Sequence, residues 1–219
     1  MGRPETDWAR CRATTQLGNG LNEAGRDNEA LAVRKLDLAA LQRLKPNDQA
    51  HILVAQTNVA NSYATLGQLE DTLRMEREIY TGTRAVFGEL HVDTFMTINN
   101  LTYSLVLLHR VEEAKRWLSE HIPRAIEALG EDQVETLKLR MNLVDALSHD
   151  DARDDLIKAE EVAADVLRRM ERVLGPLHPL TKAPRDQLRS ARAKLAALDA
   201  NELEEAGAKP PEAKRQRTH

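Results

Sequence analysis

The chain has a single cysteine, and it has no long apolar run. One cysteine among 219 residues, Cys11, excludes an intramolecular disulfide and agrees with a reducing compartment. No stretch approaches the ~20 apolar residues that cross a bilayer, and the N-terminus lacks the apolar core of a secretory signal. We therefore expect no membrane association and a cytoplasmic location. The nucleus is the alternative, because the basic tail Lys214-Arg215-Gln216-Arg217 is similar to an import signal.

Glycine, proline and aromatic residues are also scarce. The chain has 10 Gly and 8 Pro, which suits long helices, and its 3% aromatic content does not favour an aromatic stacking platform. Hydrophobic residues make up 42% and charged residues 30%, as in folded soluble proteins. The net charge of −4 gives no electrostatic reason to expect a polyanion. We expect no nucleic-acid partner.

What the chain does contain is a repeat of 42 residues. Glycines and apolar residues recur at this spacing: Gly25 with Gly67, Gly88 with Gly130, and Leu17 with Val59, Leu101 and Leu143. His109 replaces the turn glycine in the third unit. A fixed period of about 20–50 residues indicates stacked units that bury their cores only against neighbours. The sequence therefore predicts a solenoid.

Each unit has the pattern of two helices joined by a turn. In the second unit, the expected buried stripe of the first helix is Ile52, Leu53, Val59, Tyr63 and Leu66. A second helix is expected over residues 69–87, with Leu73, Ile79, Ala85 and Val86 among its buried positions and Gly88 as a left-handed cap. The third unit repeats the layout with Met96, Ile98, Leu101, Leu105 and Leu108, and Pro123 is expected to kink its second helix.

The period also predicts the boundaries of the units. We expect an atypical first repeat over residues 1–45, repeats over 46–88, 89–130 and 131–175, a capping helix in 176–200 and a disordered polar tail over 201–219. The fourth unit has a period of 45, because Gly175 follows Gly130 by that much. We place the three extra residues in its inter-helix turn, where insertions are tolerated.

The period alone fits HEAT, armadillo or tetratricopeptide units, so the joints between units decide the repeat type. The sequence of the last joint is Leu174-Gly175-Pro176-Leu177-His178-Pro179-Leu180-Thr181. The joint from Phe87 to Thr94 has glycine, histidine and threonine at the same positions. Over residues 14–182 this pattern resembles the long tetratricopeptide repeats of kinesin light chains. The resemblance implies an all-α, right-handed α-solenoid of about four helix-turn-helix repeats with a C-terminal capping helix. It also implies a concave groove lined by the first helices, which binds protein or peptide.

Two polar columns run along the expected first helices. One column is Asn19, Asn61, Tyr103 and Asp145, and its neighbour is Gln16, Asn58, Asn100 and Asn142. Further polar residues nearby are Arg12, Asn22, Thr57, Asn99 and Lys138. Amides carry both donors and acceptors and can grip a peptide backbone. For the Asn19 column we favour a role in the groove, with a structural role as the alternative, because asparagine is a poor choice inside a helix without some use. For the Gln16 column we favour structural hydrogen bonds between helices. The predicted peptide-binding groove therefore contains Asn19, Asn22, Thr57, Asn61, Asn99, Tyr103, Lys138 and Asp145.

The sequence shows no constellation of residues that would support catalysis. His91 and His178 occupy equivalent joints far apart, no His-Glu-x-x-His or Cys-x-x-Cys pattern occurs, and the glycines near Gly18 do not precede a βαβ unit. We expect a non-enzymatic protein without cofactor or metal.

The leading hypothesis for function is an adaptor that binds a peptide or helix in the groove. The alternative is a fragment or accessory module of a larger repeat protein that associates with itself or with neighbouring repeats. An RNA-binding repeat is disfavoured, because its units are nearer 35 residues and the chain is acidic.

Overall fold

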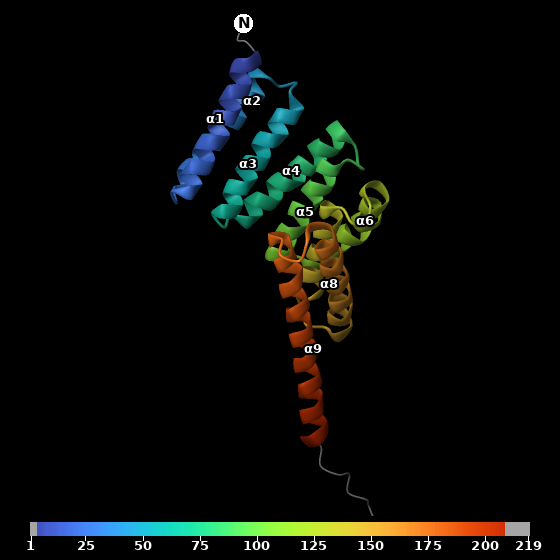
Figure 1. Ribbon diagram of the computed structural model, residues 1–219. Coiled ribbons are helices and arrows are strands. Elements are labelled where there is room, and N and C mark those ends of the chain that lie inside the picture. Colours follow the sequence, from blue (N-terminus) through green and yellow to red (C-terminus); the bar gives the residue numbers. More distant parts are fainter. Residues whose placement is uncertain (1–3, 209–219) are drawn as a thin grey trace, which may run out of the picture. The chain divides into compact units, whose positions relative to one another are not determined.

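A computed structural model describes the backbone of residues 4–208 and the side chains of residues 12–204 (Figure 1). Within these ranges the chain is all-α, with nine α-helices, one short 3₁₀ helix and no strand. The helices are α1 (Pro4–Glu23), α2 (Asp27–Leu44), α3 (Gln49–Thr65), α4 (Leu69–Phe87), α5 (Val92–Leu107), α6 (Val111–Leu129), α7 (Val134–Leu147), α8 (Arg153–Leu174), η1 (Pro179–Thr181) and α9 (Lys182–Ala208).

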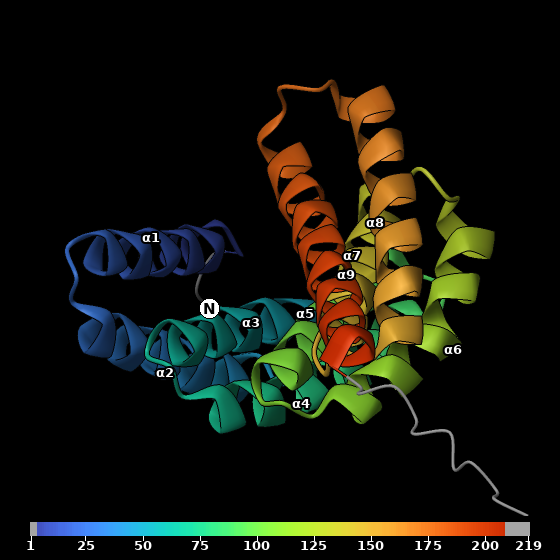
Figure 2. The ribbon, with the colours of Figure 1, turned by 90° about the horizontal axis from the view of Figure 1, so that it is seen from below.

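The helices form two compact units, which divide inside α7 between Asn142 and Leu143. In the first unit each helix from α1 to α6 packs on the next one along the chain, and α1, α2 and α3 lie side by side (Figure 1). In the second unit the end of α7 packs with α8 and α9 around Val144, Ala163 and Ala191 (Figure 2). Stacking of sequence neighbours is the arrangement that the 42-residue period predicts.

The turn inside the first three repeats is the same hydrogen-bonded motif. Gly25, Gly67 and His109 all have positive φ, at 70°, 70° and 57°. The amide after each reaches back five residues, as Gln68 N does to Tyr63 O at 2.9 Å and Arg110 N does to Leu105 O at 2.9 Å. This is the Schellman ending, which favours glycine and tolerates histidine less well. The turn recurs because its conformation is set locally.

The joint between repeats is fixed by its glycine, histidine and threonine. Gly88 has φ 95° and ψ 167°, a region essentially restricted to glycine. This is positive φ, as expected, but not the left-handed helical conformation that we predicted. His91 Nδ1 accepts from Asp93 N at 3.2 Å and so caps α5, while buried Thr94 donates its hydroxyl to Gly88 O at 2.7 Å. In the second unit His178 Nδ1 accepts from Leu180 N at 3.2 Å and so caps η1, while buried Thr181 donates its hydroxyl to His178 O at 2.6 Å and to Pro176 O at 3.1 Å. The joint histidines are thus helix caps.

The predicted buried stripes are largely confirmed, with three exceptions. Ile52, Leu53, Val59 and Tyr63 are buried in α3, and Leu73 and Ile79 are buried in α4. The prediction was wrong for Ala85, Val86 and Met96, which are exposed. In α4 the buried face consists of Thr72, Leu73, Glu76, Ile79 and Thr83. Polar residues occupy positions on this face that an apolar pattern does not reveal, and the face ends before the last turn of the helix.

The fourth repeat and the C-terminal helix differ in length from the expectation. The turn over residues 148–152 is longer than the turn over residues 108–110, and α8 also gains length, with 22 residues against 19 in α6. The expected disordered tail is wrong for residues 201–208, which continue α9 to Ala208. Asn201, Glu202, Leu203 and Glu204 extend the helix because Leu and Glu are good helix formers. The rest of the tail, with Lys214-Arg215-Gln216-Arg217, lies outside the described residues.

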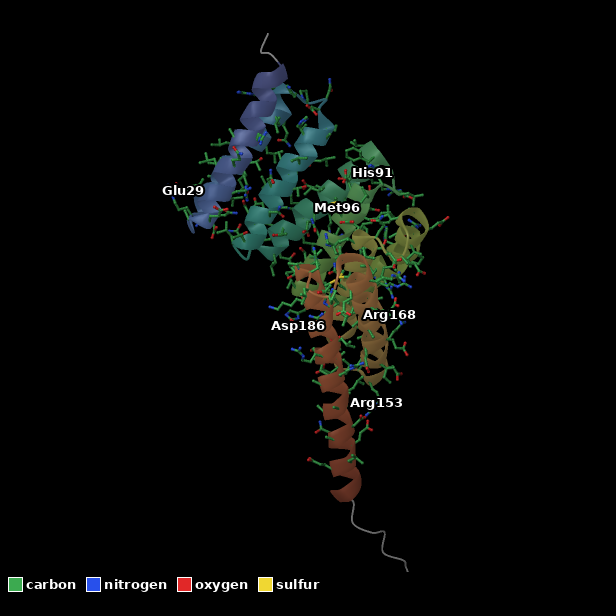
Figure 3. The ribbon with its side chains drawn as sticks, in the orientation of Figure 1. Glu29, His91, Met96, Arg153, Arg168 and Asp186 are labelled. Carbon is green, nitrogen blue, oxygen red and sulfur yellow. The ribbon has the colours of Figure 1, made fainter. Side chains whose placement is uncertain are left out.

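The end of the second unit is held by ion pairs between α8 and α9. Arg153 contacts Asp199 at 2.7 Å and Glu202 at 3.0 Å, which places charges of α9 against the start of α8 (Figure 3). Arg192 Nε donates to Glu160 at 2.8 Å further along the same pair of helices. These solvent-exposed contacts lie beside the part of α9 that runs past the predicted boundary at residue 200.

Candidate binding groove

A pocket of about 310 Å³ opens between α3 and α5, and buried residues of α4 form its base. Its volume lies at the small end of the range for ligand pockets, which is about 300–1,000 Å³. Apolar lining comes from Ala50, Leu53, Val54, Ala60, Ile79, Phe87 and Met96. Polar lining comes from Thr57, Asn58, Asn61, Glu76, Thr83, Asp93, Thr97 and Asn100. Val54 and Met96 are 60% and 46% exposed, so they lie at the open side of the pocket (Met96 is labelled in Figure 3).

Six of the predicted groove residues lie on the first helices of the first three repeats, and four of these are exposed there or line the pocket. Thr57 and Asn61 line the pocket on α3. Asn19 on α1 and Tyr103 on α5 are exposed at the equivalent positions one repeat away on either side. The Asn19 side chain is also bound internally, because its Oδ1 accepts from Arg34 Nη2 at 2.8 Å.

Asp145, the fourth member of that column, is engaged inside the second unit. Its carboxylate accepts from Gln187 Nε2 of α9 at 2.7 Å. Burial raises the pKa of Asp145, and the hydrogen bond from Gln187 partly offsets this. The helix α9 therefore covers the position that the sequence pattern assigns to a ligand.

The remaining predicted residues do not gather at the pocket. Asn99 accepts from Asn142 Nδ2 through its backbone oxygen at 2.8 Å and its side-chain oxygen at 3.1 Å. Lys138 Nζ lies 3.4 Å from Glu135 Oε1 on the same helix. Asn22 is partly buried, and its Oδ1 has no hydrogen-bond partner among the described residues.

The neighbouring amide column joins helices to one another in two of its four positions. Asn142 is 7% exposed and also donates to Thr102 Oγ1 at 3.0 Å, so it links α7 to α5. Asn58 Nδ2 donates to Thr15 Oγ1 at 3.4 Å and links α3 to α1. Gln16 and Asn100 are exposed. The structural interpretation of this column holds for Asn142 and Asn58.

Two buried charged residues were missed by the sequence analysis. Arg34 on α2 and Glu76 on α4 are 5% and 9% exposed, and they stand 42 residues apart at equivalent positions. The next two equivalents are Leu118 and, after the insertion, Ala163, which are both fully buried. The period itself would have revealed this inward-facing column, because Leu118 and Ala163 mark it as a core position.

Both terminal nitrogens of the buried Arg34 guanidinium have hydrogen-bond partners, whereas its Nε has none among the described residues. Its Nη1 donates to Ser62 Oγ at 2.6 Å and its Nη2 donates to Asn19. Gly18 makes room for it, since a Cβ at that residue would lie 2.7 Å from Arg34 Nε. The guanidinium thus joins α1, α2 and α3, and burial lowers its pKa.

Glu76 has neighbours equivalent to those of Arg34, but one of its carboxyl oxygens has no hydrogen-bond partner among the described residues. Ser104 and Asn61 stand where Arg34 has Ser62 and Asn19, 42 residues earlier. A hydrogen bond with Ser104 favours the ionised form, but burial outweighs it and raises the pKa of Glu76 to about 7. Its Oε2 is buried and has no hydrogen-bond partner among the described residues. Glu76 therefore lines the pocket with a carboxyl group of which one oxygen, Oε2, is buried and has no hydrogen-bond donor among the described residues.

Metal sites and membrane spans were also sought in the described part of the chain. Among side chains of residues 12–204 there is no group of three or more His, Cys, Asp or Glu that could hold a metal ion. No helix within residues 4–208 combines the length and apolar character needed to span a membrane.

Comparisons with known proteins identify the repeat. The family model described as tetratricopeptide repeat matches residues 52–93, which run from α3 through α4 to the start of α5. No curated protein matches the chain. A solved structure with a similar fold contains nearly identical TPR-like repeats of a Podosopora anserina protein assigned as a kinesin light chain. A variant form of these repeats has a TM-score of 0.69 and 20% identity over 90% of this chain and 92% of the other.

Two further structures agree with this result. Another structure of the Podosopora anserina repeats gives a TM-score of 0.68 and 20% identity over 94% of each chain. BtubC (BKLC) from P. vanneervenii gives 0.68 and 16% over 99% of this chain and 87% of the other. The chain has the tetratricopeptide-repeat fold. Solenoids of this type are in general non-enzymatic scaffolds for protein interaction, and the repeat in residues 52–93 contributes α3 and α4 to the pocket.

Proposed function

We propose that this tetratricopeptide-repeat chain is an adaptor that binds a peptide or helix of a protein partner along α1, α3 and α5. The observation that carries the proposal is the open pocket between α3 and α5, in which exposed apolar side chains stand beside amides and hydroxyls. Apolar lining with a few polar groups is the usual composition of a ligand site. The tetratricopeptide solenoid, a fold that generally serves protein binding, supports the same function.

Affinity capture with a groove variant tests this function. Asn61→Ala combined with Tyr103→Ala removes two exposed side chains of the groove, whereas Leu36→Ala removes an exposed apolar side chain on α2. We expect quantitative mass spectrometry to find proteins that are retained by the wild type and by Leu36→Ala but are lost from the double variant. Equal retention by all three proteins would contradict binding in the groove.

A second candidate function is self-association through α1. Leu17 is 54% exposed, although the equivalent Val59 and Leu101 are 1% and 0% exposed. Val59 is buried because it packs against α2 of the preceding repeat, and Leu17 has no such helix before it within the described residues. A second copy of this chain could cover α1 in the same way.

Sedimentation velocity at several protein concentrations separates the two candidates. Self-association through α1 predicts a sedimentation coefficient that rises with concentration and a Leu17→Ser variant that remains monomeric. A monomer at all concentrations favours the adaptor.

We propose a cytoplasmic location, with the nucleus as the alternative. A fluorescent fusion with and without Lys214 to Arg217 would distinguish the two locations.

A further inference from the structure

The charged groups of the pocket have one sign. Glu76 lies at its base and Asp93 lies at its α5 side, while the described lining contains no lysine, arginine or histidine. The groups that α3 contributes to the polar lining are amides and a hydroxyl, at Thr57, Asn58 and Asn61. An acidic ligand would meet the carboxyl groups of Glu76 and Asp93 and no basic side chain in the lining. The pocket is complementary to a cation.

The position in the first repeat that is equivalent to Glu76 shows which cation a neighbouring serine and asparagine can accommodate. This position holds the guanidinium of Arg34, which donates to Ser62 and Asn19. In the second repeat a carboxylate, Glu76, stands where the first repeat has the guanidinium. The equivalent serine and asparagine are kept around it, as Ser104 of the third repeat and Asn61 of the second. Beside that carboxylate lies the open pocket, and Oε2 of Glu76 has no donor among the described residues.

We propose that the pocket binds an arginine side chain of the partner peptide, with the Glu76 carboxylate as the main acceptor and Asn61 beside it. This inference rests on the proposed function and names the side chain that the groove selects. The aliphatic stem would pack against Leu53, Ile79 and Met96, which line the same pocket. The fork of the guanidinium can donate to a carboxylate and to an amide oxygen together, which the single ammonium of lysine does less well.

A purely apolar side chain fits the pocket less well. It would contact Val54 and Phe87 but would leave the buried Oε2 of Glu76 without a donor. The geometry therefore favours a long side chain with an apolar stem and a cationic end.

The test is selection of short random peptides displayed on phage against the full-length protein. The protein is used as wild type, as Glu76→Gln and as Glu78→Gln. The second variant is the matched control, because Glu78 lies on the same helix, is exposed and is not part of the pocket lining. Peptides selected by the wild type and by Glu78→Gln should share an arginine at one fixed position. Peptides selected by Glu76→Gln should lack that preference.

Fluorescence anisotropy with one selected peptide then measures the contact. Replacing its arginine by glutamine should weaken binding to the wild type by about tenfold or more and binding to Glu76→Gln by about twofold or less. Replacement by lysine should have an intermediate effect. Circular dichroism checks that each variant is folded.

The outcomes separate this inference from the proposed function. If no peptide is enriched by any form, the peptide-binding function fails and this inference fails with it. If peptides bind and the Asn61→Ala, Tyr103→Ala double variant releases them, but no arginine is selected, only the arginine pocket is wrong. An arginine preference that survives in Glu76→Gln also overturns it.

Discussion

Replacing Glu76 by glutamine should stabilise the protein by an amount that grows as the pH rises from about 4.5 to about 7 and then stays constant. Burial raises the pKa of Glu76 from its ordinary value of 4.5 to about 7 in the folded protein. The folded state therefore binds this proton more tightly than the unfolded state does. The contribution of protonated Glu76 to the free energy of unfolding is fully present below pH 4.5 and is lost as the pH rises through 7. The difference between a pKa of 4.5 in the unfolded protein and about 7 in the folded protein corresponds to ~3 kcal/mol. This is the free energy of unfolding that Glu76→Gln should recover above pH 7.

Urea unfolding at a series of pH values from 4.5 to 8.5 measures this effect. The difference in unfolding free energy between Glu76→Gln and the wild type should be near zero at the acid end and should grow to roughly 2–3 kcal/mol at the alkaline end. Glu78→Gln, on the exposed side of the same helix, controls for the change in net charge. A difference that does not depend on pH would refute the assignment of a desolvated carboxylate at the base of the pocket.

Three further substitutions test the contacts that hold the repeats together. Arg34→Ala leaves the buried Ser62 hydroxyl without its donor and should reduce the unfolding free energy in urea by about 2–4 kcal/mol; a loss under about 1 kcal/mol would contradict its bridging role. Asn142→Ala removes the hydrogen bonds to Asn99 and Thr102 and should lower the thermal midpoint, with a cost of about 1–3 kcal/mol; an unchanged midpoint would show that these bonds are not structural. Gly88→Ala places a side chain at φ 95° and should cost about 1–3 kcal/mol, while the same change at exposed Gly20, which is helical with open space around it, should be neutral or stabilising.

The repeat architecture could be predicted from the sequence because its signals are local. Gly67 and Gly88 mark backbone conformations that other residues rarely adopt, and so the expected second helix over residues 69–87 coincides with α4. His91 and Thr94 make the joint recognisable through a helix cap and a short hydrogen bond. Each of these features depends on residues within a few positions along the chain.

The details of the groove depend on contacts between distant residues, and these were not predictable in the same way. The apolar pattern of a single helix cannot place Arg34 and Glu76 inside. Their burial can be recognised only when the repeats are aligned with one another, because Leu118 and Ala163 then mark the position as core. Their partners Ser62 and Ser104 lie on other helices. The prediction of the Asn19 column assumes that its four positions have the same surroundings in every repeat. The last repeat differs, because α9 supplies Gln187 to Asp145 and closes that end of the column. Residues 201–208 were misjudged because polar composition alone does not distinguish a solvated helix from a tail.

Photo-cross-linking from the groove tests the central claim most directly. A photoreactive amino acid replaces Asn61 on α3, and in a separate protein it replaces Leu36, which is exposed on α2 outside the pocket lining. After irradiation in the cells that produce the protein, mass spectrometry identifies the attached polypeptides. We predict adducts with a segment of another protein from position 61 and none of the same identity from position 36. Adducts only with further copies of this chain, or the same adducts from both positions, would contradict a ligand groove between α3 and α5.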